Sequence, residues 1–105
     1  MSRKKNEGTA MPVYDLQDMH FEWDDDKNRK NREKHGISFE TAMHVFEDKD
    51  CIENYDQAHS QFEDRYQVIG MVRQILLVVY TERNERIRII SARKANQQER
   101  RLYQL

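Results

Sequence analysis

The chain has 105 residues, a formal net charge of −1 and 35% charged residues. A single domain is the default at this length, and such a domain buries only about 60–65% of the surface that its unfolded chain exposes. The core must therefore come from a few concentrated apolar segments. The net charge argues against a protein that binds nucleic acid nonspecifically through a large basic surface.

The charge is distributed unevenly along the chain. Residues 1–60 carry 9 Lys/Arg and 14 Asp/Glu, a net of −5, whereas residues 61–105 carry 9 and 5, a net of +4; together they give −1. A basic C-terminal half joined to an acidic N-terminal half suits a localised anionic ligand.

Cysteine and hydropathy favour a cytoplasmic protein. Cys51 is the one cysteine, so no internal disulfide can form, which fits a reducing compartment. No apolar run approaches the roughly 20 residues of a membrane span. The basic start of the chain lacks the apolar stretch of a secretory signal. We expect no contact with a membrane.

The N-terminal third is predicted to contain a tail, a strand and a polar helix. Residues 1–17 show no clear period and are predicted to be a flexible tail, which leaves 18–105 as a single domain. Residues 19–23 alternate as in a short strand. The helix begins at Asp24, whose carboxylate can cap it, and ends before Gly36, a left-handed C-cap.

This helix has almost no apolar face, and two interpretations stay open. It is either a solvated surface helix stabilised by charge pairs, or a polar helix whose Asn31, Lys34 and His35 face a site or a partner.

The remaining elements alternate between apolar stripes and turns. Ser38 can cap a second helix, whose stripe of Phe39, Ala42, Met43 and Phe46 indicates core packing. Strands are predicted over 51–56, 65–72, 74–81 and 86–92, and a C-terminal helix over 95–103. The order β-α-α-β-β-β-β-α, with short turns between the last strands, predicts an α+β fold with a mainly antiparallel sheet.

Arginines concentrate on the predicted strands of the basic half. Residues 80–94 carry Arg83, Arg86, Arg88, Arg93 and Lys94. Guanidinium groups on a rigid sheet can each hold phosphate oxygens through two parallel hydrogen bonds. Arg88 lies between two isoleucines and so is predicted to face away from the core. This pattern indicates RNA as the ligand.

Five motifs follow one another through the part of the chain that is predicted to fold. They are Phe21-Glu22-Trp23-Asp24, Lys34-His35-Gly36-Ile37-Ser38-Phe39, Val45-Phe46-Glu47-Asp48, Val78-Val79-Tyr80-Thr81-Glu82-Arg83 and Arg88-Ile89-Ile90-Ser91-Ala92-Arg93-Lys94-Ala95. With these motifs the chain closely resembles the BrnT family of toxins from type II toxin–antitoxin systems. The resemblance spans about residues 20–103. It implies a RelE-like fold and an endoribonuclease that halts translation. It also implies a BrnA-like ribbon-helix-helix antitoxin as partner, and operator DNA contacted only through the complex that represses the operon.

RNA cleavage without a metal needs groups that move protons and groups that stabilise the charge of the phosphorane. We predict no metal or cofactor, because the histidines and Cys51 lack compact ligand spacing. The expected products are a 2′,3′-cyclic phosphate and a 5′-hydroxyl.

The sequence offers candidates both for proton transfer and for charge stabilisation. The candidates for charge stabilisation are Arg65, Arg83, Arg88 and Arg93, each of which could instead form a structural ion pair. His35 is a candidate acid or base, and Glu99 a base or a group that orients an arginine. Lys34, Arg93 and Ser91 are predicted to contact phosphate, and Tyr103 to stack on a base. The alternative function is a noncatalytic RNA- or protein-binding module with the same fold.

Overall fold

A computed structural model describes residues 11–104, which form one six-stranded sheet with helices packed against it. The sheet order is β1-β2-β6-β5-β4-β3. The strands are β1 (Val13–Leu16), β2 (Met19–Glu22), β3 (Ile52–Tyr55), β4 (Tyr66–Val72), β5 (Gln74–Arg83) and β6 (Arg86–Lys94). Neighbouring strands are antiparallel except for the parallel pair β2–β6.

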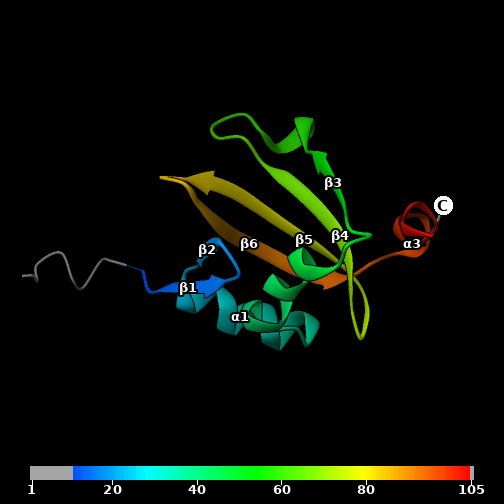
Figure 1. Cartoon of the computed structure of the whole chain (residues 1–105), viewed down its shortest axis with the longest axis horizontal. Helices are drawn as coiled ribbons and strands as arrows, with labels where there is room; N and C mark the ends of the chain where they lie inside the picture. The colour runs from blue at the N-terminus through cyan, green and yellow to red at the C-terminus, as the bar shows by residue number, and fades with distance from the viewer. Residues whose placement is uncertain (1–10, 105) are drawn as a thin grey trace, which may run out of the picture.

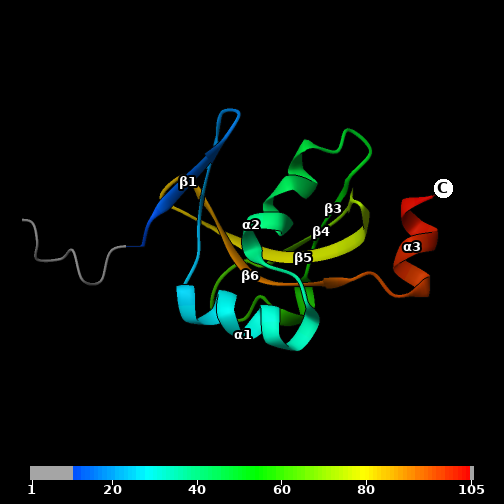
Figure 2. The same cartoon turned by 90° about the horizontal axis from the view of Figure 1, so that it is seen from below.

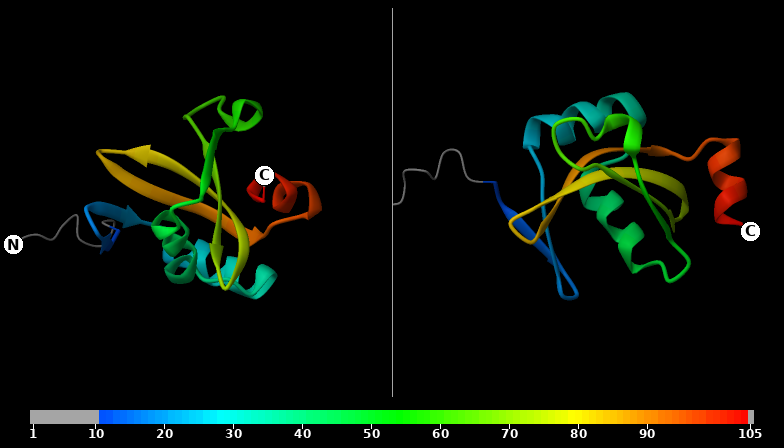
Figure 3. Two further views of the ribbon diagram at one scale, coloured as in Figure 1. Left: turned by 45° about the vertical axis from the view of Figure 1, so that its right-hand side comes forward. Right: turned by 90° about the horizontal axis from the view of Figure 1, so that it is seen from above.

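The helices lie on both faces of the sheet (Figure 1). They are α1 (Asp25–His35), α2 (Phe39–Ala42) and α3 (Gln97–Tyr103), with short 3₁₀ segments η2 (Met43–Glu47) and η3 (Gln57–His59). Figure 2 shows α1 and α2 across one face, and Figure 3 shows α3 apart from them at the end of the sheet. The predicted α+β class is confirmed. None of the helices in the described residues is long and apolar enough to cross a membrane.

The first strand corrects the sequence analysis. Val13–Leu16 lies within the range predicted to be a tail, yet it pairs with β2, Val13 opposite Glu22 and Leu16 opposite Met19. The Tyr14 ring stacks on Trp23 with ring centroids 4.2 Å apart, which supplies an apolar contact that the short segment lacks on its own. Residues 1–10 of the predicted tail lie outside the described residues.

The core fills the space between the sheet and α1, α2 and η2. Phe21, Trp23, Phe39, Val78 and Ile89 are all almost completely buried there. A smaller apolar cluster lies on the opposite face under α3, and consists of Ile69, Ile75, Leu77 and Ala95. The strand β5 lies between β6 and β4 and contributes to both clusters, so it is apolar on both faces of the sheet.

Close packing of η2 on the sheet depends on a glycine. A Cβ atom at Gly70 of β4 would lie 3.0 Å from Val45 Cβ and 3.1 Å from Val45 O. Both contacts are tighter than real side chains normally allow, so η2 can lie against β4 only because this position has no side chain.

The polar helix α1 docks through amides rather than through apolar side chains. Asn31 is buried and donates from Nδ2 to Ile37 O (2.9 Å) and Ala92 O (2.8 Å), while its Oδ1 accepts from Ala92 N (3.2 Å). Asn28 accepts from Phe39 N and donates to Glu40. Asn31 thus satisfies part of the β6 edge that no strand covers, and neither sequence interpretation of this helix included such a role.

Replacing Asn31 with alanine should destabilise the fold, because it leaves buried backbone groups without partners. We expect a loss of about 2–3 kcal/mol in the free energy of unfolding, measured by urea denaturation. Arg32→Ala, at an exposed position of the same helix, is the matched control and should change the value by less than about 0.5 kcal/mol. Equal losses in the two variants would contradict this role.

Candidate functional site

The arginines of β5 and β6 lie on one face of the sheet, opposite the face covered by α1 and α2. We call this face the arginine face. Tyr80 and Ile89 are paired in the register and both point into the core, so the next pair, Thr81 and Arg88, points to the other face. Arg83 pairs with Arg86 and lies on the same face.

A bulge in β6 brings Arg93 to this face as well. Five positions separate Arg88 from Arg93, and a regular strand would turn them to opposite faces. The register shifts between Val79, which pairs with Ser91, and Tyr80, which pairs with Ile89, so Ile90 is an extra residue. The pairing of Arg93 with Leu77, which belongs to the cluster under α3, confirms the placement.

Glu63, in the loop before β4, holds two of the arginines together. Its carboxylate accepts from Arg83 Nη2 at 2.8 Å and lies 3.8 Å from Arg65 Nη2. The hydrogen bond from Arg83, with the charges of Arg83, Arg65 and Arg88, lowers the pKa of Glu63 against the effect of burial. Glu63 therefore joins Arg83 of β5 and Arg65 of the loop into one group.

Glu22 plays a similar part at the other end of the arginine face. One of its oxygens lies 3.4 Å from Arg86 Nη1 and the other lies 4.0 Å from Arg88 Nε. The face thus carries five arginines (Arg65, Arg83, Arg86, Arg88, Arg93) against three paired glutamates (Glu22, Glu63, Glu99). The group keeps an excess of positive charge.

A hollow of about 260 Å³ lies between the loop before β4 and β6. It is lined by Asp56, His59, Arg65, Gln67, Leu77, Val79, Ile90, Ser91 and Arg93. Three residues predicted from the sequence, Arg65, Ser91 and Arg93, therefore meet around one space. Its volume and cationic walls suit a phosphate group.

Arg93 also forms a bidentate ion pair with Glu99 of the last helix. Its Nη1 and Nη2 each donate to a Glu99 oxygen at 2.9 Å, and Glu99 forms a capping box with Asn96 at the start of α3. Burial acts to raise the pKa of Glu99, but the hydrogen bonds from Arg93 and Asn96 outweigh it and lower the pKa. This geometry orients the guanidinium at the edge of the hollow.

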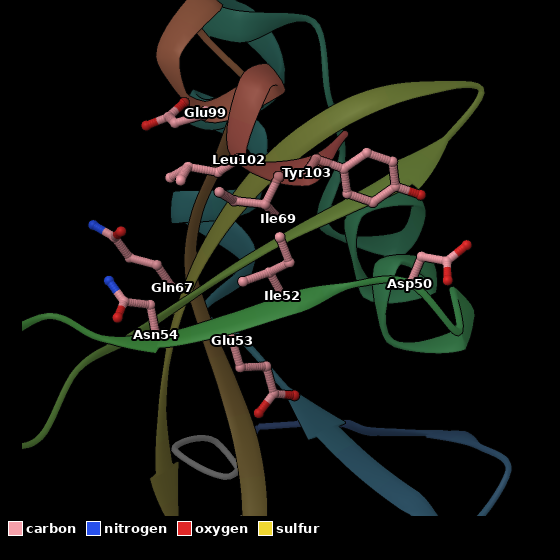
Figure 4. Close-up of a pocket in the computed structure, with 9 residues that line it drawn as sticks. All are labelled: Asp50, Ile52, Glu53, Asn54, Gln67, Ile69, Glu99, Leu102 and Tyr103. Carbon is pink, nitrogen blue, oxygen red and sulfur yellow. The ribbon is translucent and has the colours of Figure 1, made fainter. Parts of the chain in front are cut away.

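Tyr103 lies at the C-terminal end of α3 and attaches this end to Asp48. Its hydroxyl donates to Asp48 Oδ2 at 2.5 Å, and this bond raises the pKa of Tyr103 to about 12. Beside it, a groove of about 780 Å³ separates α3 from β3 and β4. Figure 4 shows Leu102 and Tyr103 facing Ile52 and Ile69 across this groove. Gln67 lines both the groove and the hollow.

Two predicted residues are not in contact with this group. Lys34 and His35 are at the C-terminal end of α1, the helix that packs on the other side of the sheet. Within residues 11–104, neither side chain forms an ion pair or hydrogen bond with the arginines.

The structure adds three polar residues that the sequence analysis did not select, namely Asp56, His59 and Gln67. Asp56 and His59 belong to a loop of low hydropathy with no regular period, so only their spacing of three residues hinted at a pair. Among the described residues, no group of three or more His, Cys, Asp or Glu is placed to hold a metal ion.

The architecture is that of a small α+β protein that presents several guanidinium groups from one sheet face. Residues 23–99, nearly three quarters of the chain, match the family described as "Ribonuclease toxin, BrnT, of type II toxin-antitoxin system". The chain therefore belongs to the BrnT family of ribonuclease toxins, and a toxin of such a system has an antitoxin as its partner.

A solved structure agrees with this assignment. The crystal structure of the Brucella abortus ribonuclease toxin BrnT is similar, with 25% sequence identity and a TM-score of 0.57. The match covers 71% of this chain and 94% of that one. No curated protein matches the sequence.

Glu99 should make the docking of α3 sensitive to acid. Because its pKa is lowered in the folded state, its contribution is present above the ordinary value of 4.5 and is lost as the pH falls through the folded value. Glu99→Gln should lower the free energy of unfolding by about 1 kcal/mol at pH 7, and the difference from the parent should be smaller at pH 3, below the ordinary pKa. Urea denaturation at both pH values, with exposed Glu82→Gln as a control that stays close to the parent, checks this.

Proposed function

We propose that this chain is a metal-independent endoribonuclease of RelE-like fold that inhibits translation by cutting RNA on the arginine face. We further propose that a BrnA-like ribbon-helix-helix antitoxin neutralises it and that the two together repress their operon, with the DNA contacts made by the antitoxin. The observation that carries the catalytic part is the meeting of Arg65, Arg93 and Ser91 around one hollow beside Arg83 and Arg88.

The reaction is an internal transfer at phosphorus. The 2′-oxygen attacks the neighbouring phosphorus, its proton leaves, and the bond to the 5′-oxygen breaks as that oxygen gains a proton. The products are a 2′,3′-cyclic phosphate and a 5′-hydroxyl. Negative charge builds up on the phosphoryl oxygens in the transition state, and guanidinium groups fixed nearby stabilise it more than they stabilise the substrate.

Seven of the predicted residues have a part in this scheme. Arg65 and Arg93 hold the scissile phosphate, and Arg88 and Arg83, beside the hollow, stabilise the charge that develops on it in the transition state. Ser91 donates a hydrogen bond to a phosphate oxygen, and Glu99 orients Arg93. Tyr103, which borders the groove, stacks on a base further along the strand. Lys34 and His35 are left outside the proposed site because they lie on α1.

A binding module without catalysis is the second candidate, and the ion pairs favour it. Each arginine of the face lies within 4.0 Å of a glutamate oxygen, as in a surface built for structure or for protein contacts. A guanidinium has five N–H donors, however, so an arginine that binds glutamate on one side can still bind phosphate on another.

Alanine at Arg88 or Arg65 should slow RNA cleavage by about 10²–10³-fold, the usual cost of removing a group that stabilises transition-state charge. The measurement is single-turnover cleavage of an RNA oligonucleotide with the purified protein in EDTA, with and without ribosomes, followed by analysis of the product ends. Arg32→Ala and His35→Ala, both on α1, are the controls and should cleave at the parental rate.

Three results of this experiment would count against the proposal. Cleavage that stops in EDTA would contradict metal independence. Full activity in folded Arg88→Ala and Arg65→Ala would remove the arginine face from catalysis. A parent that binds RNA but leaves it intact in every condition would select the binding module.

The antitoxin complex should weaken as salt is added. An excess of arginines is best covered by a segment rich in Asp and Glu, and such contacts are screened by ions. We expect the dissociation constant of the purified toxin–antitoxin complex to rise steadily between 50 mM and 500 mM salt, as measured by titration calorimetry, and to rise less steeply for Arg83→Ala. A constant that is flat across this range would contradict the electrostatic basis of neutralisation.

A further inference from the structure

We propose that His59 is the general base of the cleavage reaction and that Asp56 is its positioning residue. This inference rests on the proposed ribonuclease function and names the group that accepts the 2′-hydroxyl proton. Both residues line the hollow that also contains Arg65, Ser91 and Arg93.

The turn that carries His59 is joined directly to Arg65. Asp56 N donates to Arg65 O at 2.8 Å, and the Ser60 hydroxyl donates to Asp56 O at 2.6 Å. Arg65 N in turn donates to Ser60 Oγ at 2.9 Å. Because these bonds close a small loop, they hold the backbone at Asp56 and Ser60 against the backbone at Arg65, which keeps the turn that carries His59 beside Arg65.

The carboxylate of Asp56 fixes the state of the imidazole ring. His59 Nδ1 lies 2.9 Å from Asp56 Oδ2 and 3.1 Å from Oδ1, and a carboxylate can only accept, so Nδ1 carries a proton. The neutral ring then has its lone pair on Nε2, where it can take a proton from a substrate. Gln67 Nε2, 3.4 Å from Asp56 Oδ2, supports the same carboxylate.

The Asp56 side chain is mostly buried and the His59 side chain is exposed, as expected of a positioning residue and a general base. The Asp56 side chain is only 10% exposed, so its position is set by the protein, whereas the His59 side chain is 69% exposed and open to a ligand. A histidine required only for packing would be buried.

Every proton in the proposed reaction is accounted for by His59 and solvent water. The 2′-hydroxyl proton passes to His59 Nε2 as the 2′-oxygen forms its bond to phosphorus, while Arg65 and Arg93 hold the phosphoryl oxygens. The bond to the 5′-oxygen breaks and that oxygen takes a proton from water. His59 then returns its extra proton to solvent, so the enzyme is unchanged after one turnover.

The chain supplies a matched control for this assignment. His44 and Glu47 form the same kind of pair, with Nδ1 2.8 Å from Oε1 and three residues of separation, also in a 3₁₀ segment. That pair lines a different depression, with Asp48, Met71, Val72 and Tyr103. Within residues 11–104 it forms no ion pair with the five arginines of the arginine face.

The test compares His59→Ala, His44→Ala and Asp56→Asn by single-turnover cleavage and by RNA affinity in a binding titration. We expect His59→Ala to lose at least about 100-fold in cleavage rate, with RNA affinity within two-fold of the parent, and imidazole added to the buffer to restore part of the rate. His44→Ala should cleave like the parent. Asp56→Asn alone should cleave more slowly than the parent. The double variant Asp56→Asn, His59→Ala should cleave at the same rate as His59→Ala alone.

A second substrate separates a base from an acid. RNA whose bridging 5′-oxygen is replaced by sulfur has a leaving group that needs no proton, so it should remain slow with His59→Ala if His59 is the base. Recovery of the parental rate on this substrate would overturn the assignment as a base, as would unchanged cleavage of ordinary RNA by folded His59→Ala. A parent that cleaves no RNA would instead refute the proposed function itself.

Discussion

The structure depends on the alternation of β6, a strand that has to serve both the core and a charged surface. Ile89 and Ala92 point into the core while Arg88 and Arg93 point away from it. A strand of strict period two cannot meet both demands with this spacing. The extra residue at Ile90 resolves the conflict, because the bulge turns the second half of the strand by one position. Without this irregularity Arg93 would not lie on the same face as Arg88.

The same strand explains why the helices are arranged as they are. A face with five arginines cannot be covered by an apolar helix without burying charge, so α1 and α2 pack on the other side and α3 covers only the apolar end near Ala95. Glu22, Glu63 and Glu99 then reduce the mutual repulsion of the guanidinium groups.

The sequence predicted the features that depend on local chemistry. The helix end at Gly36, with its φ of 74°, and the cap at Ser38 follow from backbone preferences. The sequence analysis missed β1, whose Tyr14 stacks on Trp23. It also missed the amide docking of Asn31, whose partners are distant in sequence. The candidate site was also predictable only in part. The arginines of the strands could be recognised from the sequence pattern. The hollow that brings His59 close to them depends on a register shift that no local rule predicts.

The stacking of Tyr14 on Trp23 also has a practical consequence. Trp23 is the one tryptophan in the chain, it is fully buried, and its indole nitrogen has no hydrogen-bond partner among the described residues. Its fluorescence therefore comes from a single dry environment between β1 and α2, on the side of the sheet away from the arginines. Emission can follow the attachment of the N-terminal strand, without any added dye, in the same sample in which RNA is being cut.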